Sequence, residues 1–156
     1  MALNPGSKTT PVQVIFNSSQ LYKGYSPDCC IDLRPDIMTN LQGVLLRFRE
    51  SLFAAQGDMK KMFYSVRVTK EKAKCKMFVW QFKGDDKLCM FMMTRLPMGN
   101  CPSTNISIVA VKETSEFEYN AKQFPKAHMA LDKNSYVDNV FDGANTKEEL
   151  EEGIGD

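Results

Sequence analysis

Phe53-Ala-Ala-Gln-Gly-Asp58-Met-Lys-Lys-Met-Phe63-Tyr-Ser-Val-Arg-Val68 is the stretch on which the interpretation of the whole chain depends. The small and apolar residues before Asp58 favour a buried strand, and Gly57 lets the backbone turn or approach another group where the carboxylate emerges. We therefore interpret Asp58 as a metal ligand at the end of a strand. The alternative is a strand followed by a short helix over residues 59–66 that Asp58 caps, because Asp is a preferred N-cap residue.

The composition is that of an ordinary soluble chain of about one domain, with 43% apolar and 25% charged residues in 156. Twenty Lys and Arg against 19 Asp and Glu leave a net charge of +1, so the overall positive charge usual in nucleic-acid binders is absent. Nucleic acid would have to bind a local patch, for which the lysine-rich residues 60–76 are the candidate. A solvated surface explains that stretch equally well, and it is the preferred explanation of acidic residues 148–152.

The cysteine pattern argues against a zinc site. The sequence has one histidine, His128, and an odd number of cysteines without Cys-x-x-Cys spacing: Cys29, Cys30, Cys75, Cys89 and Cys101. The adjacent Cys29 and Cys30 indicate reduced thiols and an intracellular compartment. The first residues lack the apolar segment of a signal peptide, and no run has the roughly 18 apolar residues of a membrane span. We expect a cytoplasmic protein, with the nucleus as the alternative compartment and no membrane partner.

Hydrophobic periodicity predicts an α+β fold with an antiparallel sheet and packed helices. Residues 1–11 are expected to form an extended arm ahead of one domain with one core. Strands are expected over residues 12–16, 53–58, 76–82 and 88–94 and in a tight hairpin over 135–142, and the run Met90-Phe-Met-Met93 is interpreted as core. Helices are expected from about Asp36 to Ser51, from Ser103, which can cap it, to Tyr119, and after the capping box at Thr146. The pattern breaks around Phe124-Pro125.

Four features follow one another in an order that suits one reaction. They are a strand ending in Asp58, the aromatic Phe63, a Pro-Met-Gly turn at residues 97–99, and a hairpin tip at Tyr136-Val-Asp138-Asn139. Phosphoryl transfer to a nucleic-acid 3′ end needs two Mg²⁺ ions that activate the attacking oxygen and stabilise the leaving one. Mg²⁺ keeps several waters and needs few carboxylates, so Asp58 and Asp138 on adjacent strands can hold it.

In this order the residues resemble the fingers and palm of a reverse transcriptase, specifically that of BEL/Pao-type LTR retrotransposons. The resemblance extends from about Pro5 to Glu152 and rests on seven segments that are each weak alone. They are Val12-Gln-Val-Ile-Phe-Asn-Ser-Ser19, Tyr22-Lys-Gly24, Leu41-Gln-Gly-Val-Leu-Leu-Arg-Phe-Arg49, Asp58-Met-Lys-Lys-Met-Phe63, Met93-Thr-Arg95, Gly99-Asn-Cys-Pro-Ser103 and Tyr136-Val-Asp138. The resemblance implies an RNA-directed DNA polymerase domain that uses an RNA or DNA template with a primer and deoxynucleoside triphosphates.

The resemblance also assigns roles to individual residues. Asp58 matches the first catalytic carboxylate of the family, and Asp138 matches the first carboxylate of its Tyr-x-Asp-Asp hairpin. Together with the Met59 carbonyl they are the expected ligands of Mg²⁺, or of Mn²⁺ in its place. Tyr136 is expected beneath the primer end.

The nucleotide is expected to contact a second group of residues. Phe63 matches the aromatic that packs under the sugar and excludes a ribose 2′-OH, although core packing would explain it as well. Met98 and Gly99 match the turn that lies against the incoming nucleotide, where Gly permits close backbone approach.

Three positions depart from the family pattern. Asn139 stands at a catalytic position where a second Asp is expected, and losing one such electrostatic element costs on the order of 10²–10³ in rate. Gln13 stands where an Arg usually contacts the triphosphate, and its neutral amide replaces the charged fork poorly. Ser103-Thr-Asn105 departs from the expected Ser-Pro-small sequence, which alters packing more than chemistry.

The expected domain, residues 12–156, corresponds to fingers and palm with the thumb absent. No thumb or ribonuclease H domain fits into the 14 residues after Asp142, so we expect a truncated part of a retroelement polyprotein with marginal stability, uncovered surfaces and a tendency to associate. One hypothesis is a polymerase domain whose activity is residual or supplied within the remainder of the polyprotein. The other is a catalytically inactive relic that binds nucleic acid or a protein. An unrelated α/β binding domain would be favoured only if Asp58 and Asp138 were far apart.

Overall fold

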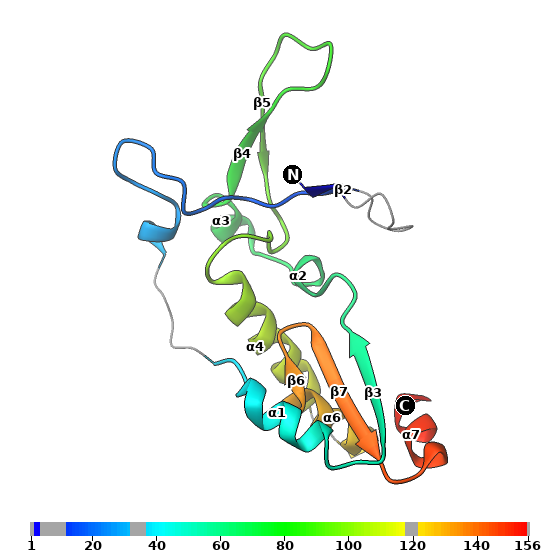
Figure 1. Ribbon diagram of the computed structural model, residues 1–156. Helices are drawn as coiled ribbons and strands as arrows, with labels where there is room; N and C mark the ends of the chain where they lie inside the picture. Colours follow the sequence, from blue (N-terminus) through cyan, green and yellow to red (C-terminus); the bar gives the residue numbers. More distant parts are fainter. Residues whose placement is uncertain (1, 4–11, 32–36, 118–121, 156) are drawn as a thin grey trace. The chain divides into compact units, whose positions relative to one another are not determined.

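The chain folds as a mixture of helices and small antiparallel sheets, described by a computed structural model for residues 2–3, 12–31, 37–117 and 122–155. The elements divide into two compact units (Figure 1). Unit 1 contains Met1–Leu33 and Phe63–Ser103, and unit 2 contains Arg34–Met62 and Thr104–Asp156. The buried apolar side chains fall in both units, with Ala73 and Leu96 in unit 1 and Val44, Met62, Ile108, Ala130 and Ala144 in unit 2.

Unit 2 is built on a three-stranded antiparallel sheet in the order β3-β7-β6. Its strands are β3 (Phe53–Asp58), β6 (Ser135–Tyr136) and β7 (Asn139–Ala144). β3 and β7 pair over their whole length, while β6 and β7 form a tight hairpin. The strand before Asp58 and the hairpin around Asp138, both predicted from the sequence, are confirmed.

β3 is not the buried strand that its small side chains suggested. Ala55 alone is half-buried in this strand, and Phe53 leaves 42% of its surface exposed. The physical reason is that β3 lies at the edge of its sheet, where it has a neighbouring strand on one side only. Asp58 does not cap a helix either, because the next helix, α2 (Met62–Ser65), begins only at Met62.

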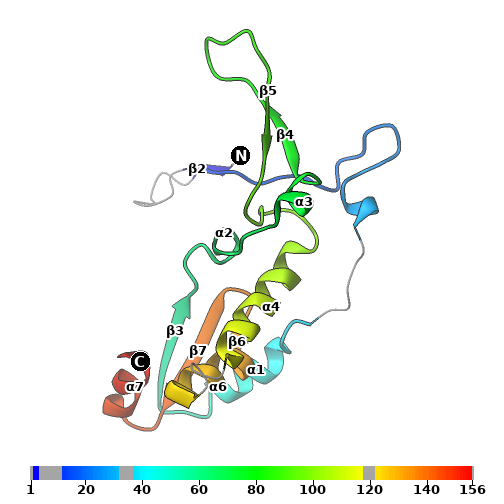
Figure 2. The same ribbon diagram turned by 180° about the vertical axis from the view of Figure 1, so that it is seen from behind.

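Four helices complete unit 2. They are α1 (Leu41–Phe48), α4 (Ser103–Glu116), α6 (Pro125–Lys133) and α7 (Lys147–Gly155). α6 packs against β6 and β7, α4 lies on the same side of the sheet, and α7 contacts β3 and β7 (Figures 1 and 2). None of the helices in the described part of the chain is long and apolar enough to cross a membrane.

Helix boundaries differ from the sequence prediction where capping decides them. The first helix begins at Leu41 rather than near Asp36, because the Asn40 side chain accepts a hydrogen bond from the Gly43 N–H at 3.2 Å. Asp36 lies outside the described residues. The break expected at Phe124-Pro125 is instead the start of α6, which has Pro in its first turn, where a missing N–H costs nothing.

The two predicted helix caps have opposite outcomes. Thr146 caps α7 as predicted, since its Oγ1 accepts a hydrogen bond from the Glu149 N–H at 3.2 Å. Ser103 does not cap α4, because its hydroxyl is buried without a hydrogen-bond partner. α4 ends at Glu116, and Tyr119, the predicted end, lies outside the described residues.

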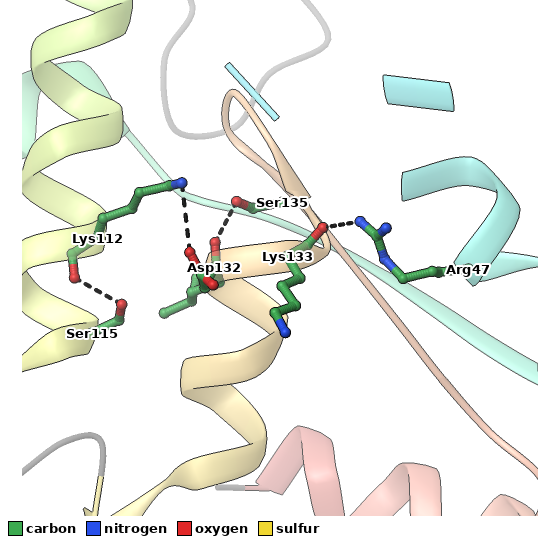
Figure 3. A network of polar contacts seen from close by, with 7 residues as sticks. Arg47, Lys112, Ser115, Asp132, Lys133 and Ser135 are labelled. Carbon is green, nitrogen blue, oxygen red and sulfur yellow. Dashed lines mark hydrogen bonds and ion pairs between the residues drawn. The ribbon is translucent and has the colours of Figure 1, made fainter. Parts of the chain in front are cut away.

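Polar contacts join α4 and α6 to the start of the β6–β7 hairpin (Figure 3). The Lys112 amine in α4 lies 3.6 Å from the Asp132 carboxylate in α6. At the end of α6, the Ser135 hydroxyl donates to the Leu131 carbonyl at 2.6 Å, and Ser135 is the first residue of β6. These contacts hold the first residue of the β6–β7 hairpin against α6.

Arg47 joins α1 to the end of α6, just before the β6–β7 hairpin (Figure 3). Its guanidinium donates to the Lys133 carbonyl and, through Nε, to Asn134 Oδ1 at 2.8 Å. One turn of α1 is also anchored by rings, because Phe48 packs edge-on against Phe141 of β7 with centroids 5.3 Å apart. These contacts hold the central strand of the sheet from the side of α1.

Unit 1 contains two small strand pairs. β1 (Ala2–Leu3) pairs with β2 (Val12–Gln13), and β4 (Met77–Trp80) forms the predicted hairpin with β5 (Cys89–Met92). The remaining elements are η1 (Asp28–Cys30) and α3 (Lys70–Ala73). The first strand is shorter than predicted, and Ile15 forms an isolated parallel bridge with Met98 instead. Residues 4–11 of the expected arm lie outside the described residues.

Candidate metal centre

A row of three side chains crosses the sheet of unit 2 at one end. The register places Asp58 of β3 directly opposite Asn139 of β7, and Asn139 directly opposite Tyr136 of β6. Directly opposite residues of antiparallel strands project from the same face of a sheet. Asp58, Asn139 and Tyr136 therefore share one face, at the end where β3 stops and the β6–β7 hairpin turns (Figure 1).

Asp138 is attached to this row from the turn of the hairpin. The Met59 N–H donates to the Asp138 carbonyl at 2.7 Å, which extends the pairing of β3 and β7 by one step. The Asn139 amide donates through Nδ2 to the Asp138 carboxylate at 3.2 Å. This bond connects the Asp138 carboxylate to the row through Asn139. The backbones of Asp58 and Asp138 lie at the same end of the sheet, one register step apart.

Asn139 is held at both ends of its amide. Its oxygen accepts from Gln56 Nε2 at 2.8 Å, while its nitrogen donates to Asp138. Gln56 was not predicted as a site residue, although it lies two positions before Asp58 and so shares its face of β3. The Asn139 amide thus makes hydrogen bonds to both Gln56 and Asp138. An aspartate at this position would instead add a negative charge.

The donor set fits Mg²⁺ held largely by water and substrate. Within the described residues, no three or more His, Cys, Asp or Glu side chains are arranged to hold a metal ion. Two carboxylates remain, from Asp58 and Asp138, and this is the minimal set that Mg²⁺ uses alongside phosphates. The Met59 carbonyl accepts from the Met62 N–H at 3.1 Å, so one of its two lone pairs is engaged.

The turn of the β6–β7 hairpin is strained. Its first central residue, Val137, has φ +56°, in the left-handed region that β-branched residues rarely occupy. Such conformations cost on the order of 1–3 kcal/mol and persist where the surrounding structure fixes them. Here the pairing of Tyr136 with Asn139 closes the turn over two residues, of which Val137 is the first.

Replacing Val137 tests this strain. Val137→Gly and Val137→Ala both remove the branched side chain, but only Gly adopts positive φ freely. We expect Val137→Gly to be more stable than Val137→Ala by about 1 kcal/mol. Urea unfolding followed by circular dichroism measures the difference, and equal midpoints for the two variants would show that the turn is relaxed.

The residues expected to contact the nucleotide belong to unit 1, whereas the expected metal ligands belong to unit 2. Phe63 is half-buried in α2, which agrees with the packing explanation of this ring. Gln13 lies in β2, opposite Ala2, and its side chain lies outside what the structure describes.

Gly99 has a structural reason of its own. The Phe16 N–H donates to the Met98 carbonyl at 2.9 Å, and the Ser18 hydroxyl donates to the Gly99 carbonyl at 2.6 Å. Gly99 has φ +91°, and a Cβ there would lie 1.9 Å from the Phe16 carbonyl oxygen. The sequence predicted a close approach of this glycine to a nucleotide, and the structure shows a close approach to the backbone of Phe16.

Gly57 does not need to be glycine for the fold. A Cβ at this position would meet nothing within 4 Å. The sequence interpretation, that glycine permits a turn or a close approach before Asp58, is not supported by any contact within the described residues.

Comparisons with known proteins give no assignment, since neither the models of known families nor the curated protein sequences match this chain. The functional interpretation therefore depends on the residues and contacts described above.

Proposed function

We propose that this chain is an RNA-directed DNA polymerase domain of the reverse transcriptase type, with fingers and palm elements and low activity. The observation that carries the proposal is the meeting of Asp58 and Asp138 at one end of the β3-β7-β6 sheet, bridged by the bond from the Met59 N–H to the Asp138 carbonyl. Two carboxylates that are remote in sequence and brought to one end of a sheet are what magnesium-dependent nucleotidyl transfer requires of a protein.

Each side chain of the row has a defined task in this proposal. Asp58 and Asp138 would hold Mg²⁺, which when bound would activate the 3′ oxygen of the primer and stabilise the leaving pyrophosphate. Asn139 positions the Asp138 carboxylate through its amide N–H and is itself oriented by Gln56. Tyr136, half-buried beside Asn139, offers a ring on which the primer end can rest.

The charge distribution supports nucleic acid as the partner. Unit 1 contains ten Lys and Arg against five Asp and Glu, a net charge of +5, whereas unit 2 contains ten against fourteen, a net charge of −4. The net charge of +1 for the whole chain therefore conceals a basic half. A basic unit favours phosphate binding without sequence preference, and it also supports the second candidate function, an inactive domain that binds nucleic acid.

Primer extension on a poly-rA template with Mg²⁺ or Mn²⁺ tests the proposal. We expect weak extension that is lost in Asp58→Asn and kept in Asp142→Asn. Asp142 is the matched control because it lies in β7 two register steps from Val140, on the face opposite Asn139. If all three proteins fail to extend the primer but bind it with a steep salt dependence, the inactive binding domain is the correct function.

A further inference from the structure

Two arginines of unit 1, Arg67 and Arg95, lie directly opposite each other in an antiparallel bridge. Two backbone hydrogen bonds flank this bridge: the Val68 N–H donates to the Thr94 carbonyl at 3.0 Å, and the Leu96 N–H donates to the Val66 carbonyl at 3.3 Å. The arginines themselves therefore form a non-hydrogen-bonded pair, the type in which opposite Cα atoms come closest, at about 4.5 Å. Two cationic side chains thus project from one face at the shortest spacing of an antiparallel pair.

The arginine pair faces away from the interior of unit 1. Leu96 follows Arg95 directly and exposes 1% of its surface, and successive residues of a strand face opposite sides. The strand that leads to Arg95 is also at the surface, since Met90 and Met92 of β5 expose 67% and 41% of their surfaces. The interpretation of residues 90–93 as core is therefore wrong for these two methionines.

The two guanidinium groups have donors to offer to a ligand. Arg95 is held in place by one bond, from its Nη1 to the Ser65 carbonyl at 2.9 Å, and its other N–H groups remain. Within the described residues, neither arginine makes an ion pair with a carboxylate, and the Arg67 side chain makes no hydrogen bond. Because like charges directly opposite each other destabilise a strand pair, an anion between them would stabilise it.

The charges of the neighbouring residues do not compensate the pair. Residues 63–76 and 93–96 contain six basic residues: Arg67, Lys70, Lys72, Lys74, Lys76 and Arg95. Their one acidic residue is Glu71, which leaves a net charge of +5. The other four basic and four acidic residues of unit 1 cancel, among them Lys83, Asp85, Asp86 and Lys87 of the loop between β4 and β5. The whole net charge of unit 1 therefore belongs to the two segments that form the arginine pair.

The chemistry of the pair suits a phosphate group. A guanidinium is a planar fork of N–H donors that binds two phosphate oxygens at once, and it keeps its charge at any working pH. A small anion would neutralise only part of a net charge of +5, whereas a nucleic-acid strand brings one negative charge per nucleotide. The charge around the pair therefore favours a nucleic-acid backbone as the source of the phosphate.

We propose that Arg67 and Arg95 hold one phosphate of a nucleic-acid backbone between them. The Ser65 carbonyl orients Arg95, Arg67 binds the same phosphate from the opposite segment, and the lysines of residues 70–76 attract the phosphates next to it. The bound phosphate removes the repulsion between the two guanidinium groups. This inference rests on the proposed function, in which nucleic acid is the substrate, and it names the residues that hold that substrate.

Fluorescence anisotropy of a labelled oligo-dT primer on poly-rA tests the pair, with the full chain titrated at several salt concentrations without Mg²⁺ or nucleotide. We expect Arg67→Gln and Arg95→Gln each to weaken binding roughly tenfold at low salt. Each should also reduce the slope of log affinity against log salt by about 1, because one phosphate contact is lost. Arg67→Gln removes no side-chain bond of the described chain, so its loss of binding cannot come from unfolding.

Two control variants separate the pair from general charge. Arg49→Gln removes an exposed arginine of unit 2, outside the two basic segments, and we expect the affinity and salt slope of the unmodified chain. Lys72→Gln removes an exposed lysine within them, and we expect a smaller loss than for either arginine. The double variant Arg67→Gln with Arg95→Gln should bind little worse than each single variant, because one shared phosphate can be lost only once.

Several results would overturn the proposal. Additive losses in the double variant, or a loss for Lys72→Gln equal to that for Arg67→Gln, would show a diffuse basic surface. Competition by polyglutamate or inorganic triphosphate as strong as that by unlabelled nucleic acid would show a site for another anion. Primer extension and binding that Arg67→Gln leaves unchanged would refute this inference alone. A chain that binds through the pair but never extends a primer would support it and refute the proposed polymerase activity.

Discussion

Asn139→Asp is expected to increase primer extension by on the order of 10²–10³ with Mg²⁺. The register already places position 139 between Asp58 and Tyr136, so a carboxylate there joins an existing cluster without rebuilding the strand. The new side chain keeps an acceptor for Gln56 Nε2 and adds the negative charge that the amide lacks. Extension rates measured on one template with equal amounts of both proteins provide the comparison.

The same substitution changes how stability depends on metal. Aspartate at position 139 cannot donate to the Asp138 carboxylate, so without Mg²⁺ three neighbouring carboxylates repel one another. We expect a lower melting temperature than the unmodified chain in EDTA and a larger rise on adding Mg²⁺, because a ligand that binds only the folded state stabilises it. Asp58→Asn in the Asn139→Asp background should lose both the rise and the activity.

Two results would contradict the proposed function, and the second of them would also contradict the metal centre. One is Asn139→Asp with unchanged activity although Mg²⁺ raises its melting temperature, which would separate metal binding from catalysis. The other is a melting temperature of Asn139→Asp that does not change when Mg²⁺ is added, which would mean that Asp58 and Asp138 do not form a common site. In either case nucleic-acid binding through the basic unit would be the remaining function.

The sequence predicts the strand before Asp58 and the hairpin around Asp138 because both depend on local patterns. A short apolar run, a turn and a Tyr-x-Asp sequence act within a few residues, so neighbours along the chain decide them. That Asp58 lies opposite Asn139 depends on the register between two strands that are remote in the sequence. The family resemblance implied that these positions lie close together, whereas hydrophobic periodicity alone could not predict it. Gln56 was missed for the same reason, since its partner lies on another strand.

Burial and capping were predicted less well because tertiary contacts decide them. Ala54 and Ala55 suit a buried strand, but the edge position of β3 leaves that strand exposed. Ser103 has the right residue type for an N-cap, yet its hydroxyl is buried without a partner. Proline at position 125 was interpreted as a break because the same residue that ends one helix also begins another.

Gly99→Ala is expected to destabilise unit 1 by roughly 3–5 kcal/mol, from positive φ and from overpacking against backbone. The added Cβ would lie 1.9 Å from the Phe16 carbonyl oxygen, which is rigid backbone and cannot rotate aside as a side chain can. The chain must shift, and the bond from the Phe16 N–H to the Met98 carbonyl at 2.9 Å is the first contact to be lost. Urea unfolding of the variant and the unmodified chain measures the loss.

Gly84→Ala separates the two causes. Gly84 has φ +90°, almost the same as Gly99, but a Cβ there would meet nothing within 4 Å. This variant should therefore lose only the conformational part, about 1–2 kcal/mol. The difference between the two variants isolates the contact of Gly99 with Phe16, so equal losses would mean that residues 15–18 do not pack against the turn at residues 97–99. A large difference would instead show that this glycine is required by the fold before any nucleotide binds.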